Sequence, residues 1–199
     1  MLSGKERLLE IVRIIKKYDL IKHATPQNLR LAIEEAGPTF IKLGQILASR
    51  DDVIPKEYCD ELSHLRNQVK PMPYEKVLEI LDREYDGKAS EIFASIEEVP
   101  IGSASIAEVH KAVLTNGQEV VIKIQRDNIY ELMAMDVRLL KKIIDILQID
   151  KIFNSVFNFK DIIDEMFETA KEEMNFLIEA SHTEEFYEKN KDILYIRSP

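Results

Sequence analysis

The sequence has little cysteine and no long apolar run, and both shortages exclude classes of protein. Its one cysteine, Cys59, cannot form an internal disulfide, which fits a reducing compartment, and we expect it to be a small buried apolar residue. A membrane-spanning helix needs roughly 18 uninterrupted apolar residues, and no stretch approaches that length. The segment Met1–His23 breaks its apolar positions with charges, unlike a signal peptide. The sequence therefore predicts a soluble chain with a cytoplasmic location.

Positive charge is also scarce. The chain has 36 acidic and 27 basic residues, a formal net charge of −9. A chain with this charge has no overall positive surface to attract a nucleic-acid backbone, so we expect no nucleic acid as a partner. The few histidines show no ligand spacing such as HExxH. We predict no metal site here, and a structural or surface role for His23, His64, His110 and His182.

The chain does contain enough hydrophobic residues for a packed core, 45% of 199 residues. Its first ninety residues predict helices, because apolar residues between Leu8 and Ile15 recur at helical spacing. Thr25-Pro26 is typical of an N-cap followed by a first-turn proline. Further helices are expected over about 39–50, from about 55, and over about 74–85, with prolines at 71 and 73 before the last.

After Gly87 the pattern changes to β-branched residues, with a turn at Asn116-Gly117. We predict three strands between about Ile96 and Ile124, forming a small antiparallel sheet in an α+β fold with helices packed on its faces. Helical periodicity returns over 128–147, an acidic segment over 159–190 predicts a helix or a broken pair, and 193–196 could begin a further strand.

One constellation indicates a nucleotide site. The kinase pattern GxGxxGxV is followed at Gly102 and Val109, with alanine at the second and third glycine positions. The segment that contains it is Ile101-Gly102-Ser103-Ala104-Ser105-Ile106-Ala107-Glu108-Val109. Val120-Val121-Ile122-Lys123 matches a VAIK-type strand. Such a loop covers phosphates with its backbone while the lysine neutralises their oxygens. Alanine makes the loop stiffer, because its methyl group excludes most positive-φ conformations.

The lysine of such a site needs a carboxylate partner, and Glu179 is the candidate, on a helix with Glu172 and Phe176 at helical spacing. Taken singly, each residue has a simpler interpretation: Lys123 as a solvated strand lysine and Glu179 as one of many acids facing water. The order and spacing of the pieces favour the nucleotide site.

These residues, with the segment GPTFIKLGQ at 37–45, resemble the ABC1/UbiB/ADCK family over about residues 30–199. The KxGQ signature is present as Lys42, Gly44 and Gln45, the alanine-rich loop begins at Gly102, and the ExD motif falls at Glu173-Met174-Asn175. Two positions depart from the family: Asn175 replaces the second acid, and Gly102 stands where many relatives carry alanine.

The resemblance implies an atypical kinase-like N-lobe. It predicts a helical extension over 1–90 with the KxGQ helix, then a partial N-lobe over 91–199 with the loop, the lysine strand, an inserted helix and an αC-like helix, and no C-lobe. The KxGQ helix would cover the nucleotide pocket, with a regulatory contact between Lys42 and Glu173. Gln45 shares the face of Lys42, and Gly44 would permit close helix approach.

The resemblance further implies an Mg-ATP-dependent kinase or ATPase connected with isoprenoid-lipid or quinone metabolism, with the Mg²⁺ ligands beyond residue 199. Because neither an HRD-type loop nor a DFG-type aspartate is present, we expect the chain alone to be inactive. The alternatives are a nucleotide-sensing or lipid- or protein-binding pseudokinase module, and a helical scaffold that binds no nucleotide. Lipid or membrane partners, reached through a C-terminal region, and self-association of the exposed sheet are further expectations.

Overall fold

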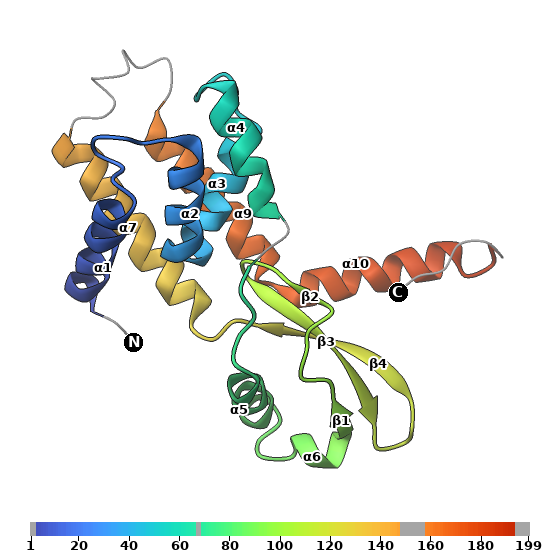
Figure 1. The fold of residues 1–199 in the computed structure, drawn as a ribbon. Coiled ribbons are helices and arrows are strands. Elements are labelled where there is room, and N and C mark those ends of the chain that lie inside the picture. The colour runs from blue at the N-terminus through green and yellow to red at the C-terminus, as the bar shows by residue number, and fades with distance from the viewer. Residues whose placement is uncertain (1–2, 67–68, 148–157, 194–199) are drawn as a thin grey trace.

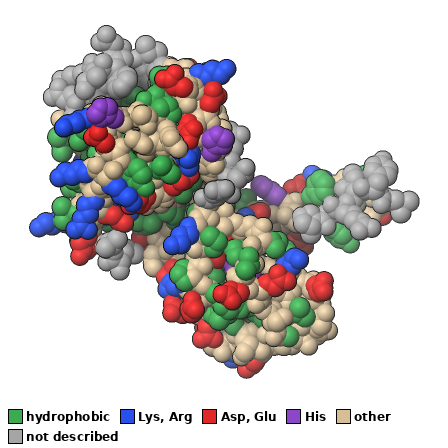
Figure 2. Space-filling model, in the orientation of Figure 1, with side chains coloured by type: hydrophobic (Ala, Val, Ile, Leu, Met, Phe, Trp, Pro, Cys, Tyr) green, Lys and Arg blue, Asp and Glu red, His purple; other side chains and the backbone are tan. Residues whose placement is uncertain are grey.

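The computed structural model describes residues 3–66, 69–147 and 158–193, and it consists of a helical layer joined to a small sheet body, with α10 projecting to one side (Figure 1). On the face shown in Figure 2, basic and acidic side chains are interspersed over the helical layer. The helices are α1 Gly4–Lys17, α2 Pro26–Ala36, α3 Pro38–Leu47, α4 Lys56–Leu62, the 3-10 helix η1 Ser63–Arg66, α5 Tyr74–Glu84, α6 Ala89–Ile92, α7 Ile129–Leu147, α9 Phe159–Glu173 and α10 Phe176–Asn190.

Local sequence explains where the first helices begin. Ser3 and Glu6 form a capping box at the start of α1, and Thr25 caps α2 ahead of Pro26. Gly37 adopts a φ of 94° between α2 and α3, a conformation that other residues rarely take. The predicted helix starts at Pro26 and near residues 39, 55 and 74 are therefore confirmed to within a residue or two.

The sheet is antiparallel and is built around β3. Its strands are β1 Phe93–Ile96, β2 Gly102–Ser103, β3 Ala107–Leu114 and β4 Glu119–Gln125. Strand β3 pairs with β1, β2 and β4, and the β3–β4 connection is the predicted turn at Asn116-Gly117. The α+β class and the antiparallel sheet are confirmed, whereas the expected three strands are four, because two residues of the loop region form β2.

Helix α5 packs on one face of the sheet. Val77, Ile80 and Leu81 of α5 form a core with apolar residues of β1, β3 and β4: Phe93, Ala112 and Ile124. In contrast, α7 and α9 pack on the helical layer, where their buried residues meet Leu43 and Ile46 of α3. Packing thus places α5 with the sheet, while α7 and α9 pack on the extension and also cover Ile106 between β2 and β3. The division at residue 90 stays a prediction.

The acidic segment forms a broken pair of helices. Helix α9 ends at Glu173 and α10 begins at Phe176, so Glu172 and Phe176 do not share one helix. The expectation of helical spacing across 172–180 was wrong, because the chain leaves helical geometry at Asn175, with φ −90° and ψ 83°. The predicted strand at 193–196 lies outside the described residues apart from Ile193, which follows a turn.

Candidate nucleotide site

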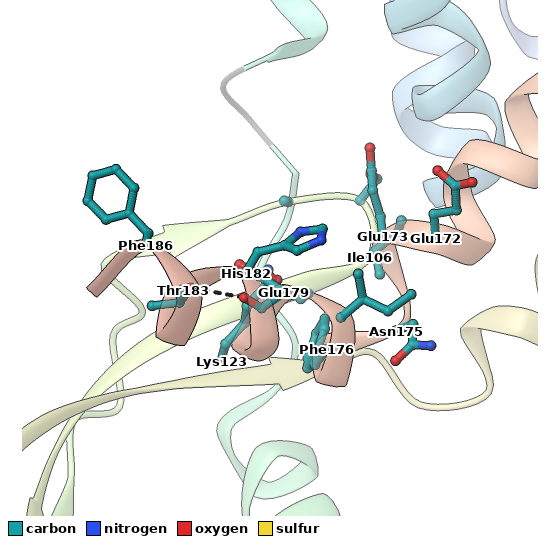
Figure 3. A pocket seen from close by; sticks show the side chains of 14 residues that line it. Ile106, Lys123, Glu172, Glu173, Asn175, Phe176, Glu179, His182, Thr183 and Phe186 are labelled. Carbon is teal, nitrogen blue, oxygen red and sulfur yellow. Dashed lines mark hydrogen bonds and ion pairs between the residues drawn. The ribbon is translucent and has the colours of Figure 1, made fainter. Parts of the chain in front are cut away.

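A cleft of about 690 Å³ lies between the alanine-rich loop, β4 and the α9–α10 junction (Figure 3). Its volume is within the range of about 300–1,000 Å³ usual for ligand sites. The lining residues are Ala104, Ser105, Ile106, Ala107, Lys123, Glu172, Glu173, Asn175, Phe176, Ile178, Glu179, His182, Thr183 and Phe186.

Lys123 and Glu179 form an ion pair at the centre of this cleft (Figure 3). Alternation along β4 directs Ile122 and Ile124 to the α5 core and leaves Lys123 on the opposite face, toward α10. The Lys123 ammonium also lies 4.7 Å from the centroid of the Phe176 ring, a cation–π geometry. The Lys123 and Glu179 side chains are 40% and 56% exposed, so solvent screens their attraction. The ion pair therefore orients the lysine and adds little to the stability of the fold.

The alanine-rich loop is a tight turn between β2 and β3. Gly102 pairs with Val109 and Ser103 with Glu108 across the two strands, and the Ala104 amide donates to the Ala107 carbonyl at 2.8 Å. No residue from 101 to 109 has a positive φ in this described segment. A methyl group at Gly102 would meet no atom within 4 Å, so the departure from alanine at this position has no steric cause.

Arg126 holds this loop in place through hydrogen bonds, and the sequence motifs did not identify this residue. Its guanidinium donates to the Ala104 carbonyl at 2.9 Å and to the Ser103 hydroxyl at 2.8 Å. Burial lowers the pKa of Arg126, and the nearby charge of Glu108 partly offsets this. Strand alternation could have identified Arg126 from the sequence. It follows β4 on the same face as buried Ile124, and a charged residue on a buried face requires partners.

The KxGQ and ExD residues meet at the edge of the cleft. Lys42 of α3 forms an ion pair with Glu173, the contact that the family resemblance implied. Gln45 instead donates to the Leu65 carbonyl of η1 at 3.1 Å. A methyl group at Gly44 would lie 2.5 Å from Leu65 Cδ1, so glycine permits this close approach. Asn175 is the N-cap residue of α10 and makes no side-chain capping bond there.

The structure gathers half of the predicted site residues in the cleft. Ala104, Ser105, Lys123, Glu173, Asn175 and Glu179 line it. Six others are not among the described lining residues: Ile101, Gly102, Ser103, Val109, Lys42 and Gln45. Phe176 and His182 also line the cleft, although sequence reasoning gave Phe176 no role and regarded His182 as structural or surface.

The cleft contains more acid than base, because Glu172, Glu173 and Glu179 line it together with Lys123. Two of these carboxylates are paired with lysines, Glu179 with Lys123 and Glu173 with Lys42, and a divalent cation would offset the remaining negative charge beside a triphosphate. Among the described residues, no group of three or more His, Cys, Asp or Glu side chains could hold a metal ion by itself. No helix in the described parts of the chain is long and apolar enough to cross a membrane.

Residues 64–199, more than half of the chain, match the model of the ABC1 atypical kinase-like domain. The chain belongs to the ABC1 atypical kinase-like family. The resemblance found from the motifs is therefore confirmed. The matched segment contains the alanine-rich loop, Lys123 and Glu179, while the KxGQ residues precede it.

Relatives of this ABC1-family chain are longer than the chain itself. The uncharacterized protein in the hydrogenase 1 5' region of Clostridium pasteurianum is 37% identical over 97% of this chain and 38% of its own length. A probable protein kinase UbiB of Marinobacter nauticus is 42% identical over 57% of this chain and 21% of its own length.

A solved structure resembles the chain as well. The Rv3197–erythromycin complex from Mycobacterium tuberculosis is 28% identical with a TM-score of 0.51, covering 92% of this chain and 46% of that one. The chain thus spans less than half the length of each of these proteins.

Proposed function

We propose that this chain is the nucleotide-binding part of an Mg-ATP-dependent atypical kinase or ATPase of the ABC1/UbiB type, with a kinase-like N-lobe. The ion pair between Lys123 of β4 and Glu179 of α10, facing the alanine-rich loop across the cleft, carries the proposal. A lysine held by a helix carboxylate beneath a small-residue loop is the arrangement that orients ATP phosphates in kinases.

Each residue has a distinct role in this proposal. The Lys123 ammonium neutralises phosphate oxygens, and Glu179 holds it extended. The backbone of 101–105 covers the phosphates, and Val109, paired with Lys123 across the strands, lies on the same sheet face as the lysine. A bound Mg²⁺ would neutralise phosphate charge, and its ligands would come from the remainder of a full-length protein. The motifs for phosphoryl transfer are absent, so the chain alone hydrolyses no ATP above background.

Lys42, Gln45, Glu173 and Asn175 are proposed to regulate this site. The ion pair between Lys42 and Glu173 holds α3 against the end of α9, at the edge of the cleft. This position limits access for a protein substrate, which favours a small molecule. The family resemblance implies isoprenoid-lipid or quinone metabolism as the setting, with lipid or membrane partners, and a cytoplasmic location stays a prediction.

Thermal unfolding with ATP and Mg²⁺ tests the proposal. A ligand that binds only the folded state stabilises it by about 2.7 kcal/mol at one hundred times its dissociation constant. We expect a rise in Tm for the wild-type chain at saturating MgATP, and no rise for Lys123→Met. Lys111→Met is the matched control, because Lys111 lies on the same face of the sheet but outside the cleft.

An unchanged Tm of the wild-type chain at millimolar MgATP contradicts the proposal and favours a helical scaffold. A rise that Lys123→Met retains would place the nucleotide elsewhere.

A second candidate is a non-catalytic binding module. Asn175 favours it, because an amide replaces the carboxylate of the ExD motif where it lines the cleft. The Rv3197 structure is a complex with erythromycin, which supports binding of a bulky organic molecule. A rise in Tm with erythromycin but not with MgATP would favour the module.

A further inference from the structure

The segment 69–73, which precedes α5, lies against the alanine-rich loop through Arg126. The guanidinium of Arg126 donates to the Lys70 carbonyl at 3.0 Å, in addition to its bonds with Ala104 and Ser103. One side chain, 12% exposed, thus joins the end of β4, the loop of the cleft and the segment that leads to the helical layer. We call residues 69–73 the connecting segment.

Glu108 makes a second attachment beside the first. Its fully buried carboxylate accepts a hydrogen bond from the Met72 amide at 2.8 Å and lies 3.0 Å from His110 Nε2. Arg126 lies 3.9 Å from the same carboxylate. His110 Nδ1 donates to the Glu97 carbonyl at 2.7 Å, so each polar group of the cluster has a partner. Such a buried polar set fixes geometry, since any displacement leaves a group unsatisfied.

We propose that Arg126 is a positioning residue that fixes the alanine-rich loop against the connecting segment. The hydrogen bond from the Met72 amide to Glu108 is a second attachment between the sheet and that segment. The nucleotide consequence rests on the proposed function: release of Arg126 loosens the loop over the phosphates and weakens ATP binding.

The chemistry selects arginine for this position. Its planar fork of N–H groups spans three acceptors from two segments, the alanine-rich loop and the connecting segment, and it stays charged when buried. Lysine reaches one or two of these acceptors, and glutamine cannot bridge all three. A graded loss from arginine to lysine to glutamine is therefore expected.

Amide hydrogen exchange of the 199-residue chain tests the coupling without any nucleotide. Arg126→Gln is expected to speed exchange about tenfold or more over both 101–107 and 69–73, and Arg126→Lys to give an intermediate effect. Arg83→Gln is the control, because Arg83 binds Asp127 at the surface of the same body.

Loop exchange that stays at the wild-type rate in Arg126→Gln would overturn the coupling of the loop to the connecting segment. An increase spread evenly over α1–α4 and the sheet would also overturn it, because that pattern reports general destabilisation. Calorimetric titration with MgATP then tests the nucleotide consequence. We expect Arg126→Gln to weaken binding about tenfold and Arg126→Lys to recover part of it.

Absence of ATP binding in the wild-type chain would reject the proposed function while leaving the exchange result to decide the coupling.

Discussion

Arg7 and Asp136 meet in a buried ion pair between α1 and α7, although 129 residues separate them in the chain. The guanidinium donates to both carboxylate oxygens at 2.8 Å, and Thr39 of α3 donates to the same carboxylate at 2.7 Å. Burial alone lowers the pKa of Arg7, but its hydrogen bonds to Asp136 and Glu10 raise that pKa above its ordinary value. Three helices therefore depend on one carboxylate.

Replacement of Arg7 by methionine is expected to destabilise the chain by about 3–5 kcal/mol, because Asp136 then remains as a buried charge without its cationic partner. Chemical unfolding measures this change. Arg13→Met, on the exposed side of α1, is the control and is expected to change stability by less than about 0.5 kcal/mol. A loss below about 1 kcal/mol for Arg7→Met would show that Asp136 is not held in this way.

Motif spacing predicted the contacts of Lys123 with Glu179 and of Lys42 with Glu173, because each pair belongs to a recognisable pattern. It did not predict Arg126, Glu108 or the partners of Asp136. These residues bond to backbone carbonyls and amides or to distant helices, and such partners leave no mark on the spacing of residue types.

At the scale of elements, the approach of η1 to α3 depends on a single missing methyl group. Gly44 lies in the middle of α3, where glycine lowers helix stability, yet an alanine Cβ there would collide with Leu65. The stability gained from the close contact of Leu65 with α3 outweighs the helix propensity lost by having glycine at position 44.

Gly44→Ala is expected to destabilise the chain by about 1–3 kcal/mol through overpacking, despite the better helix propensity of alanine. Thermal or chemical unfolding reports the change. Gly44→Ala combined with Leu65→Val should regain part of the loss, because the shorter side chain makes room for the new methyl group. If Gly44→Ala proved neutral or stabilising, Leu65 would have to be free to move away.

Element boundaries were predictable wherever a cap or a proline sets them, as at Thr25-Pro26. The break at Asn175 was not, because Glu172, Phe176 and Glu179 keep apparent helical spacing across it. Strand β2 was missed because it has only two residues and is defined by pairing with β3 rather than by its own composition.

At the scale of the whole molecule, α10 extends from the sheet body and has no buried residue within the described part of the chain (Figure 1). Several apolar side chains of α10 are well exposed, with Leu177 at 83%. Val121 of β4 is also exposed and lines a hollow together with residues of α10. Exposed apolar surface of this kind favours association with another copy.

We expect the chain to self-associate in sedimentation velocity, with a weight-average mass that rises with concentration. Leu177→Lys should lower this association because it puts a charge on α10. Ile21→Lys, at an equally exposed apolar position in the helical layer, should leave it unchanged. A mass that is independent of concentration in the wild type would contradict the expectation.

The ion pair of Arg7 with Asp136 also bears on where this domain can be divided. The family match starts at residue 64, but Asp136 and the inner faces of α7 and α9 find their partners in α1 and α3. A protein trimmed to the matched segment would keep the carboxylate and discard the guanidinium that neutralises it. We therefore expect the boundary of recognisable similarity not to be a boundary of cooperative folding, and expression of the candidate site to require the preceding helices.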